Sequence, residues 1–264
     1  MNFNVHGGHS LKCRGASGLL DEVNEDRKVK NRVIELLRAN GHTVYDCTDD
    51  SGKDQNSNLK AIVNKCNDHK VDLDVSIHLN AGGGTGTEVY VYSDSSKAKD
   101  EAERIAKNIS NTLGIRNRGV KTSTKLYVLR KTNSPALLVE CCFVDNAIDK
   151  VKWNADKCAK AIVEGILNKS VNEHVETPTP KPQSNASSTL GIYMITASDL
   201  SVRTGPGANC RRKTYEELTK NAKAHDYDKD GCLNYGTRVT VSEFNGDWAK
   251  IPSGWVARKY LKKV

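Results

Sequence analysis

The spacing of apolar residues predicts that the first part of the chain switches repeatedly between strands and helices. Short apolar runs that end in glycine, histidine or a carboxylate have the length and composition of buried strands. Between them, apolar residues recur every three or four positions, as in amphipathic helices. Strands that alternate with helices predict an α/β fold, in which a mostly parallel twisted sheet is flanked by helices.

These predicted elements can be placed along the chain. The expected strands are a run from Phe3, then Thr43–Cys47, Val71–His78, Thr87–Tyr92, Leu126–Leu129 and Ala136–Cys142. The expected helices are residues 21–40, 57–68, 96–113 and 154–167. The first helix is expected to stop at Asn40-Gly41, because glycine commonly stands just past a helix end.

The composition changes after Lys169 and indicates two domains. Residues 172–189 contain three of the chain's six prolines and almost no large apolar residue, which predicts a semi-extended linker. It would join a domain at 1–171 to a smaller one at 190–264, where short strands and turns predict an all-β fold. The total of 264 residues is enough for two domains with cores of their own.

Four polar residues stand at the ends of predicted elements rather than inside them. His9 follows the first strand, Glu25 lies at the head of the first helix, and His78 and Glu140 each end a later strand. Ligands of open α/β sheets bind at this edge. Two histidines and a glutamate can form a catalytic zinc site with one position left for water. The second glutamate is then free to move protons.

This arrangement resembles the zinc-dependent N-acetylmuramoyl-L-alanine amidases of the type 3 class. The resemblance covers roughly residues 2–168, and the motifs that carry it are Gly8-His9, Glu25, Ser76-Ile77-His78-Leu79-Asn80 and Val139-Glu140. It implies zinc bound by His9, Glu25 and His78. It also implies Glu140 as the catalytic proton shuttle and Asn80 as a substrate-binding residue.

Two ligand assignments have rivals. Many family members carry Asp-Pro-Gly-His-Gly-Gly, whereas this chain has Val-His-Gly-Gly-His-Ser, so His6 competes with His9. We favour His9, because a glycine precedes it directly and Ser10 follows it. Glu22 is the rival to Glu25.

The resemblance implies a peptidoglycan hydrolase. It would cut the amide bond between N-acetylmuramic acid and the L-alanine of the stem peptide through a zinc-bound water. The variant with serine after the histidine is similar to clostridial phage endolysins, which need a holin to reach the wall. The alternatives are a host autolytic or sporulation amidase and a zinc peptidase that acts within the stem peptide.

The C-terminal part carries a second resemblance. Leu200–Gly207, Trp248–Ile251 and Gly254-Trp255-Val256 are similar to bacterial SH3-like domains, which implies binding to wall peptide or polymer. Residues 190–264 hold 13 Lys and Arg against 8 Asp and Glu, so this part is basic. An insertion at about 213–232 is absent from the minimal SH3-like pattern.

The insertion contains Asp226, Asp228 and Asp230 followed by a glycine, which matches the first half of a calcium-binding loop. Thr237 stands where that loop needs a bidentate glutamate. A calcium site and a solvated acidic turn are therefore both open.

Charge and hydropathy limit which partners and which cellular location we expect for the protein. The net charge is +8, but no run of five Lys or Arg supports nucleic-acid binding. No apolar run approaches the roughly 20 residues of a membrane span, and the N-terminus has no signal-peptide pattern. We therefore expect the protein to stay in the host cytoplasm until release and then to act at the cell wall. The eight cysteines have irregular spacings, and six of them, Cys13 to Cys158, are expected to be free thiols.

Overall fold

The computed structural model describes residues 1–171, 190–197, 199–207, 209–226 and 229–264. The chain divides into two compact units, Met1–Thr177 and Pro178–Val264. The segment predicted to be a linker, residues 172–189, lies outside the described residues.

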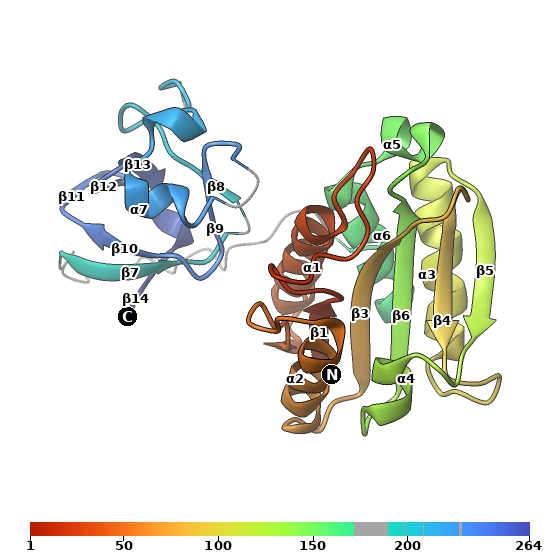
Figure 1. Ribbon diagram of the computed structural model, residues 1–264. Helices are drawn as coiled ribbons and strands as arrows, with labels where there is room; N and C mark the ends of the chain where they lie inside the picture. Colours follow the sequence, from red (N-terminus) through yellow and green to blue (C-terminus); the bar gives the residue numbers. More distant parts are fainter. Residues whose placement is uncertain (172–189, 198, 208, 227–228) are drawn as a thin grey trace. The chain divides into compact units, whose positions relative to one another are not determined.

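A central sheet organises the first unit (Figure 1). Its six described strands are ordered β2-β1-β3-β6-β4-β5, and all neighbours run parallel except β4 and β6, which are antiparallel. The strands are β1 (Asn2–Gly7), β2 (Thr43–Asp46), β3 (Leu73–Asn80), β4 (Thr87–Val91), β5 (Asn117–Thr122) and β6 (Ala136–Phe143). The expected α/β fold with a parallel-rich sheet is confirmed.

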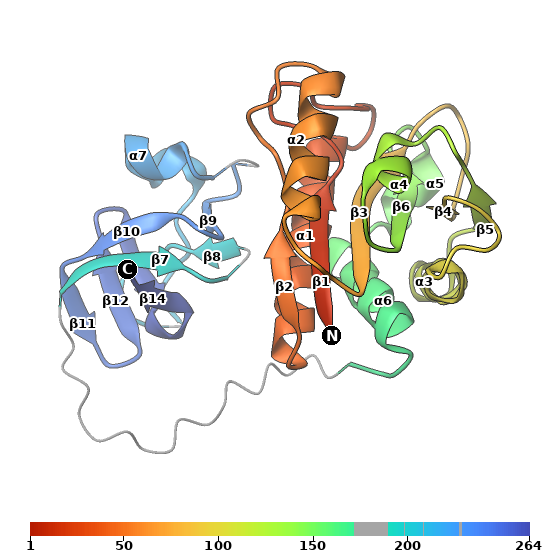
Figure 2. The ribbon, with the colours of Figure 1, turned by 90° about the horizontal axis from the view of Figure 1, so that it is seen from below.

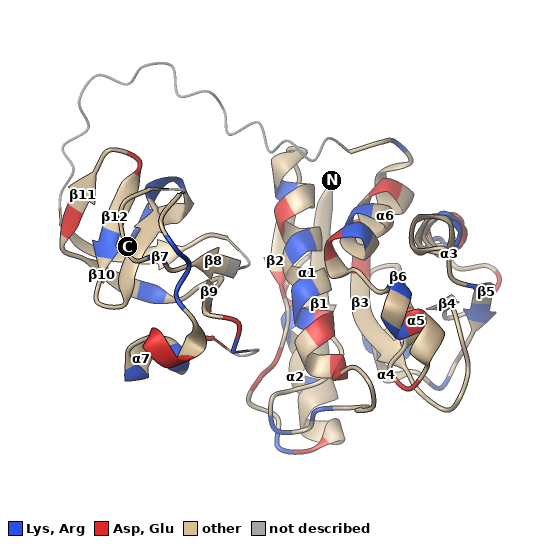
Figure 3. Ribbon diagram, turned by 90° about the horizontal axis from the view of Figure 1, so that it is seen from above, with Lys and Arg blue, Asp and Glu red and all other residues tan. Residues whose placement is uncertain are grey.

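Helices cover both faces of this sheet, as Figure 2 shows from below. They are α1 (Glu22–Ala39), α2 (Gln55–Asn67), α3 (Lys99–Leu113), α4 (Tyr127–Lys131), α5 (Ala147–Lys152) and α6 (Ala155–Leu167). Helices α1, α3 and α6 share one large apolar core with the sheet, whereas α2 and α4 share a smaller core on the opposite face. Figure 3 shows basic and acidic residues interspersed along α1.

The alternation of side chains along β6 and β3 fixes which residues meet at the site. On β6, Leu137 and Val139 belong to the large core, while Leu138 belongs to the core under α2 and α4. Because successive strand residues face opposite sides, Glu140 points to the same face as Leu138. On β3, His78 lies between two large-core residues, so it also faces the α2 side. The register places His78 directly beside Glu140.

The structure corrects one predicted strand and adds two elements. Leu126 is the N-cap of α4 and residues 127–129 form its start instead of a strand, with Val128 and Leu129 buried beneath α2. A short apolar run does not by its periodicity distinguish a strand from a buried helical turn. Strand β5 and helix α5 were not predicted. β5 has no buried residue and carries charged side chains, so it lacks the apolar pattern of a strand.

The second unit is a small strand-rich structure, which agrees with the expected β architecture. Its described strands form the sheets β10-β7-β14, β11-β12-β13 and β8-β9. They are β7 (Gly191–Ile195), β8 (Asp199–Ser201), β9 (Cys232–Asn234), β10 (Arg238–Val241), β11 (Glu243–Asn245), β12 (Trp248–Ile251), β13 (Gly254–Ala257) and β14 (Leu261–Lys263). Between β8 and β9 lie the 3-10 turn η1 (Tyr215–Glu217) and the short helix α7 (Lys220–Lys223), and η2 (Arg258–Tyr260) precedes β14. Ile195, Leu233 and Val256 are among the residues of its separate core.

Two further expectations concern the state of the cysteines and membrane-spanning helices. All eight cysteines lie among the described residues, and all are free thiols. Within the described ranges, no helix combines the length and the apolar character that crossing a membrane requires.

Asp74 on β3 gives the fold a pH dependence. Its buried carboxyl accepts a hydrogen bond of 2.6 Å from Asn4 Nδ2, and burial raises its pKa to about 6. A raised pKa means that the folded state binds the proton more tightly than the unfolded state, so stability is lost as pH rises through about 6. Asp74→Asn should therefore stabilise the protein at pH 8 by about 1–3 kcal/mol, with the gain vanishing below about pH 4. Urea unfolding of parent and variant at both pH values measures this. An equal difference at both pH values would contradict it.

Candidate metal centre

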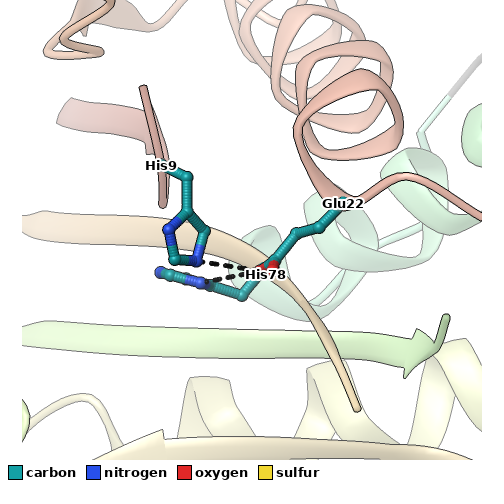
Figure 4. Close-up of side chains that lie close together, drawn as sticks. All are labelled: His9, Glu22 and His78. Carbon is teal, nitrogen blue, oxygen red and sulfur yellow. Dashed lines mark hydrogen bonds and ion pairs between the residues drawn. The ribbon is translucent and has the colours of Figure 1, made fainter. Parts of the chain in front are cut away.

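Three side chains from distant parts of the chain meet at the end of the sheet (Figure 4). The Glu22 Oε1 atom lies 3.3 Å from His9 Nε2 and 3.1 Å from His78 Nδ1. One potential ligand atom from each residue lies within 4.8 Å of the others. The two imidazole rings are 5.1 Å apart and nearly perpendicular. Two nitrogen donors and one carboxylate oxygen in this arrangement are a donor set that suits zinc.

The start of α1 places Glu22. Asp21 is the N-cap residue, and its Oδ1 accepts a hydrogen bond of 3.0 Å from the Asn24 backbone N–H. Glu22 is therefore the first residue of the helix, and it is almost fully buried. Its Oε1 also accepts a 3.1 Å bond from Leu79 N–H, and its Oε2 accepts a 2.7 Å bond from Ala16 N–H. These bonds hold the carboxylate against both β3 and the loop before α1.

Two glycines make room for the cluster. A Cβ atom on Gly8 would overlap the imidazole of His78, and one on Gly15 would overlap Glu22 and His9. Gly15 also has a φ of +71°, a backbone conformation that other residues rarely adopt. Because these two glycines lack a Cβ atom, the backbone can pass close to the three side chains without displacing them.

The electrostatics of the cluster centre on Glu22. Burial alone would raise its pKa, but the hydrogen bonds with His78 and His9 outweigh burial and hold the pKa well below its usual range. Burial lowers the pKa of His78. Burial also opposes the charged form of His9, but the hydrogen bond to Glu22 and its charge raise that pKa. An ionised carboxylate and a neutral His78 are the forms that bind a metal.

Two further residues of α1, Asp26 and Arg27, bind the backbone of the loop that carries His9. One nitrogen of the Arg27 guanidinium donates to the backbone carbonyl of His9 and, at 2.7 Å, to Asp50. Its other terminal nitrogen donates to Asp26 at 2.6 Å, and Asp26 accepts a 3.2 Å bond from Gly8 N–H. Burial raises the pKa of Asp26 to about 7. The same helix therefore carries Glu22 and fixes the backbone on both sides of the Gly8–His9 peptide.

Glu140 lies next to this cluster on β6, paired in register with His78. Burial, followed by repulsion from the Glu22 and Glu88 carboxylates, raises its pKa to about 8. Its Oε2 atom is buried and has no hydrogen-bond partner among the described residues. An oxygen in this state is free to exchange a proton with a bound molecule.

Glu25 is not part of the cluster, which differs from the expectation. Its Oε2 accepts a 2.8 Å bond from Trp153 Nε1, and its Oε1 lies 3.3 Å from Lys28 Nζ. The reason is the register of α1: the helix begins at Glu22, so Glu25 lies almost one turn further along. Asp21, a residue type common at N-caps, was the sequence signal for this start.

His6, the rival of His9, also lies outside the cluster. It is buried inside β1, with Nδ1 at 3.2 Å from the carbonyl oxygen of Gly7, and burial lowers its pKa to about 4. Asn80 lies at the end of β3. Its Nδ2 donates to Glu88 at 2.8 Å, and its Oδ1 accepts from Ala81 N–H at 2.8 Å. Both contacts shape the loop beside the site.

A cavity of about 220 Å³ opens beside His9 and His78. Leu59 of α2, Leu126 and Tyr127 at the start of α4, and Leu138 of β6 supply apolar walls. Gln55 and Lys125 add polar groups to the lining. The cavity thus opens onto the two histidines of the cluster from the α2 side of the sheet.

The calcium expectation has no support in the structure. Asp226 is buried, and its carboxylate accepts backbone hydrogen bonds from Asp230 at 3.1 Å and Gly231 at 2.8 Å. Asp230 in turn accepts a 2.8 Å bond from Cys232 N–H. Asp228 lies outside the described residues. These turn contacts account for Asp226 and Asp230 without a cation.

The fold and the site together define an α/β domain with a three-residue candidate metal centre at one end of its sheet. Residues 5–169 match the family model of N-acetylmuramoyl-L-alanine amidases. The chain belongs to this family, which confirms the expectation of an amidase-class enzyme.

Known proteins similar to the chain agree with the family. The catalytic domain of the CD27L endolysin, described as targeting Clostridia Difficile, has 31% identity and a TM-score of 0.60 over 65% of this chain and 99% of that one. Cwp6 from Clostridium difficile has 34% identity and a TM-score of 0.56 over 64% of this chain and 29% of that one. An uncharacterized protein of Clostridium perfringens is 39% identical over 67% of this chain and 54% of its own length. The chain thus spans about half the length of the curated relatives it matches first.

Metal binding by Glu22 and Glu25 can be compared directly. Glu22→Gln should weaken zinc affinity by more than about 100-fold, because even outer partners of zinc ligands are worth about 10- to 100-fold. Glu25→Gln should leave affinity unchanged, since a glutamine oxygen can still accept the bond from Trp153. Competition titration with a chromogenic chelator measures both. Loss of zinc in Glu25→Gln with retention in Glu22→Gln would restore the assignment made from sequence.

Proposed function

We propose that the chain hydrolyses the amide bond between N-acetylmuramic acid and the L-alanine of the peptidoglycan stem peptide. We further propose that His9, Glu22 and His78 hold one zinc ion for this reaction. The observation that carries the proposal is the convergence of these three donors on one another at the edge of the sheet. The family match supports an amide as the class of bond that is hydrolysed.

The residues present fit zinc. Two imidazoles and one carboxylate are a known catalytic zinc set, and the glycine backbone leaves no Cβ in the way. When bound, zinc would supply an activated water and a positive charge for the developing oxyanion. The protein's part is to hold the donors rigid, and the bonds from Leu79 and Ala16 to Glu22 do so.

Glu140 is the proposed proton shuttle. A raised pKa makes its carboxylate a stronger base than an exposed glutamate, and its buried Oε2 is free to accept a proton. The side chain would take a proton from the attacking water and pass it to the leaving amine of L-alanine. Asn80, through its bond to Glu88, is proposed to shape the substrate-binding loop.

The substrate is proposed to lie in the cavity next to His9 and His78. Its apolar walls suit an alanine methyl group, and Lys125 and Gln55 suit the polar backbone or the acidic groups of a stem peptide. The second unit is proposed to be an SH3-like domain that binds the cell wall. Its strand-rich fold and its excess of Lys and Arg support this role on an anionic wall.

The similarity to the CD27L endolysin catalytic domain supports a phage lytic enzyme. Such an enzyme would need a holin for access to the wall from the cytoplasm. The alternatives are a host amidase with the same chemistry and a peptidase that cuts within the stem peptide.

Mass spectrometry of the products from purified clostridial walls tests the proposed bond. An amidase releases intact stem peptides with a free N-terminal L-alanine and leaves the glycan strands without peptide. Removal of metal by a chelator should stop release, and zinc should restore it. Shortened peptides, with residues left on the glycan, would instead show a peptidase.

Glu140→Gln should separate chemistry from metal binding. The glutamine keeps the size of the side chain but cannot accept the proton, so kcat should fall by about 10²- to 10⁴-fold. Zinc content should stay near that of the parent, because His9, Glu22 and His78 are unchanged. Activity assays with zinc analysis of the same samples measure this. Full activity in the variant, or loss of its zinc, would contradict the role of proton shuttle.

A further inference from the structure

The insertion at 213–232 belongs to the second unit, whereas the candidate metal centre is built from residues of the first. It contains η1, the helix α7 and the acidic turn that leads into β9. The hydrogen bonds of Asp226 close this turn onto the backbone of Asp230 and Gly231. The carboxylate therefore anchors the C-terminal end of the insertion and sets the position of α7 and His225, which directly precede it.

Helix α7 forms one wall of a cavity of about 240 Å³. The opposite walls are β10 and the turn between β12 and β13. Ala222, Leu233 and Ile251 give the cavity an apolar floor, and all three are buried. Asn221, His225 and Arg238 add polar side chains to the lining. All of these residues belong to the second unit, so the cavity is complete within it.

Five of the polar side chains in the lining form two sets. The hydroxyls of Thr219 and Ser253 bond to each other at 2.9 Å, so they serve the fold. The guanidinium of Arg238, the imidazole of His225 and the amide of Asn221 form no hydrogen bond or ion pair with another described residue. Arg238 is exposed on β10, where its backbone pairs with Met194. Three side chains with unused hydrogen-bonding groups thus surround one apolar floor.

The charge of the lining selects an anion. Arg238 is its one Lys or Arg, and the described lining contains no Asp or Glu. A guanidinium binds a carboxylate through two parallel hydrogen bonds. His225 and Asn221 can bond to an adjacent peptide group, and the apolar floor suits a methyl side chain. A phosphate polymer would gain little here, because it needs a row of cations and makes no use of an apolar floor.

We propose that this cavity binds the free C-terminal carboxylate of a short peptide that ends in a small apolar residue. This is the chemistry of the uncross-linked end of a wall stem peptide. The inference rests on the proposed function, since it names the ligand of the proposed wall-binding unit. In this proposal the insertion supplies one wall of an open binding cavity on the strand surface.

The test measures binding of the full chain, as Glu140→Gln to prevent digestion, to purified walls stripped of their anionic polymers. In this background Arg238→Gln should weaken binding roughly tenfold, the usual effect of losing a hydrogen bond to a charged group. The matched control is Lys262→Gln, which removes an exposed cation of β14 outside the cavity and should bind as the parent does. N-acetyl-D-alanyl-D-alanine should compete, and its C-terminal amide should not. Equal melting temperatures exclude misfolding, and His225→Gln provides a second variant of the cavity.

The outcomes separate the two proposals. If the parent chain binds stripped walls and neither Arg238→Gln nor His225→Gln weakens binding, the cavity inference is overturned and wall binding stands. If binding disappears when the polymers are stripped and the peptide does not compete, the ligand is the phosphate polymer and the carboxylate assignment is wrong. If the parent does not bind walls but still releases peptides from them, the targeting role and the cavity inference both fail while the amidase proposal stands.

Discussion

The carboxylate of Glu22 is the interaction on which the site depends. It reaches His9 and His78 through one oxygen and accepts backbone hydrogen bonds from Leu79 and Ala16. One buried charge thus ties the start of α1 to β3 and to the loop that follows β1. Burying a carboxylate is costly unless it is hydrogen-bonded and paired. Here the partners that offset this cost are also two of the three candidate metal donors.

The parallel sheet brings the remaining chemistry to the same place. Neighbouring strands β3 and β6 bury alternate residues in the large core, which turns His78 and Glu140 together toward the face that α2 covers. Two carboxylates, Glu22 and Glu140, then lie in one buried site with opposite environments. Contacts with the histidines lower the pKa of Glu22, whereas burial and repulsion from neighbouring carboxylates raise that of Glu140. The structure in this way separates a candidate ligand from a candidate base.

Much of this could be predicted from the sequence, and the exceptions have physical causes. The α/β class follows from apolar periodicity, and Gly7 correctly marks the end of β1 before His9. The expectation that His78 and Glu140 end their strands was wrong, because β3 continues to Asn80 and β6 to Phe143. The first helix was expected at residues 21–40 and begins at Glu22, so its start was predicted closely. Glu22 and Glu25 both lie in its first turn, and the predicted start alone did not distinguish them. The contacts of Glu22 with both histidines and its backbone bonds from Leu79 and Ala16 decide between the two, and these contacts appear only in the folded structure. The short run at 126–129 has no periodicity that distinguishes helix from strand, so packing beneath α2 decides its form.

In the proposed function the first unit hydrolyses the substrate and the second unit binds the cell wall. Each unit has a cavity for its ligand. In the first, the described cavity adjoins the candidate metal donors, and in the second the insertion supplies a wall. The proposed hydrolysis depends on the metal centre. Zinc K-edge X-ray absorption of the loaded protein reports the atoms that bind the metal. The account predicts a first shell of nitrogen and oxygen with the scattering pattern of two imidazoles. A sulfur shell from a cysteine, or the pattern of a third imidazole such as that of His6, would contradict it.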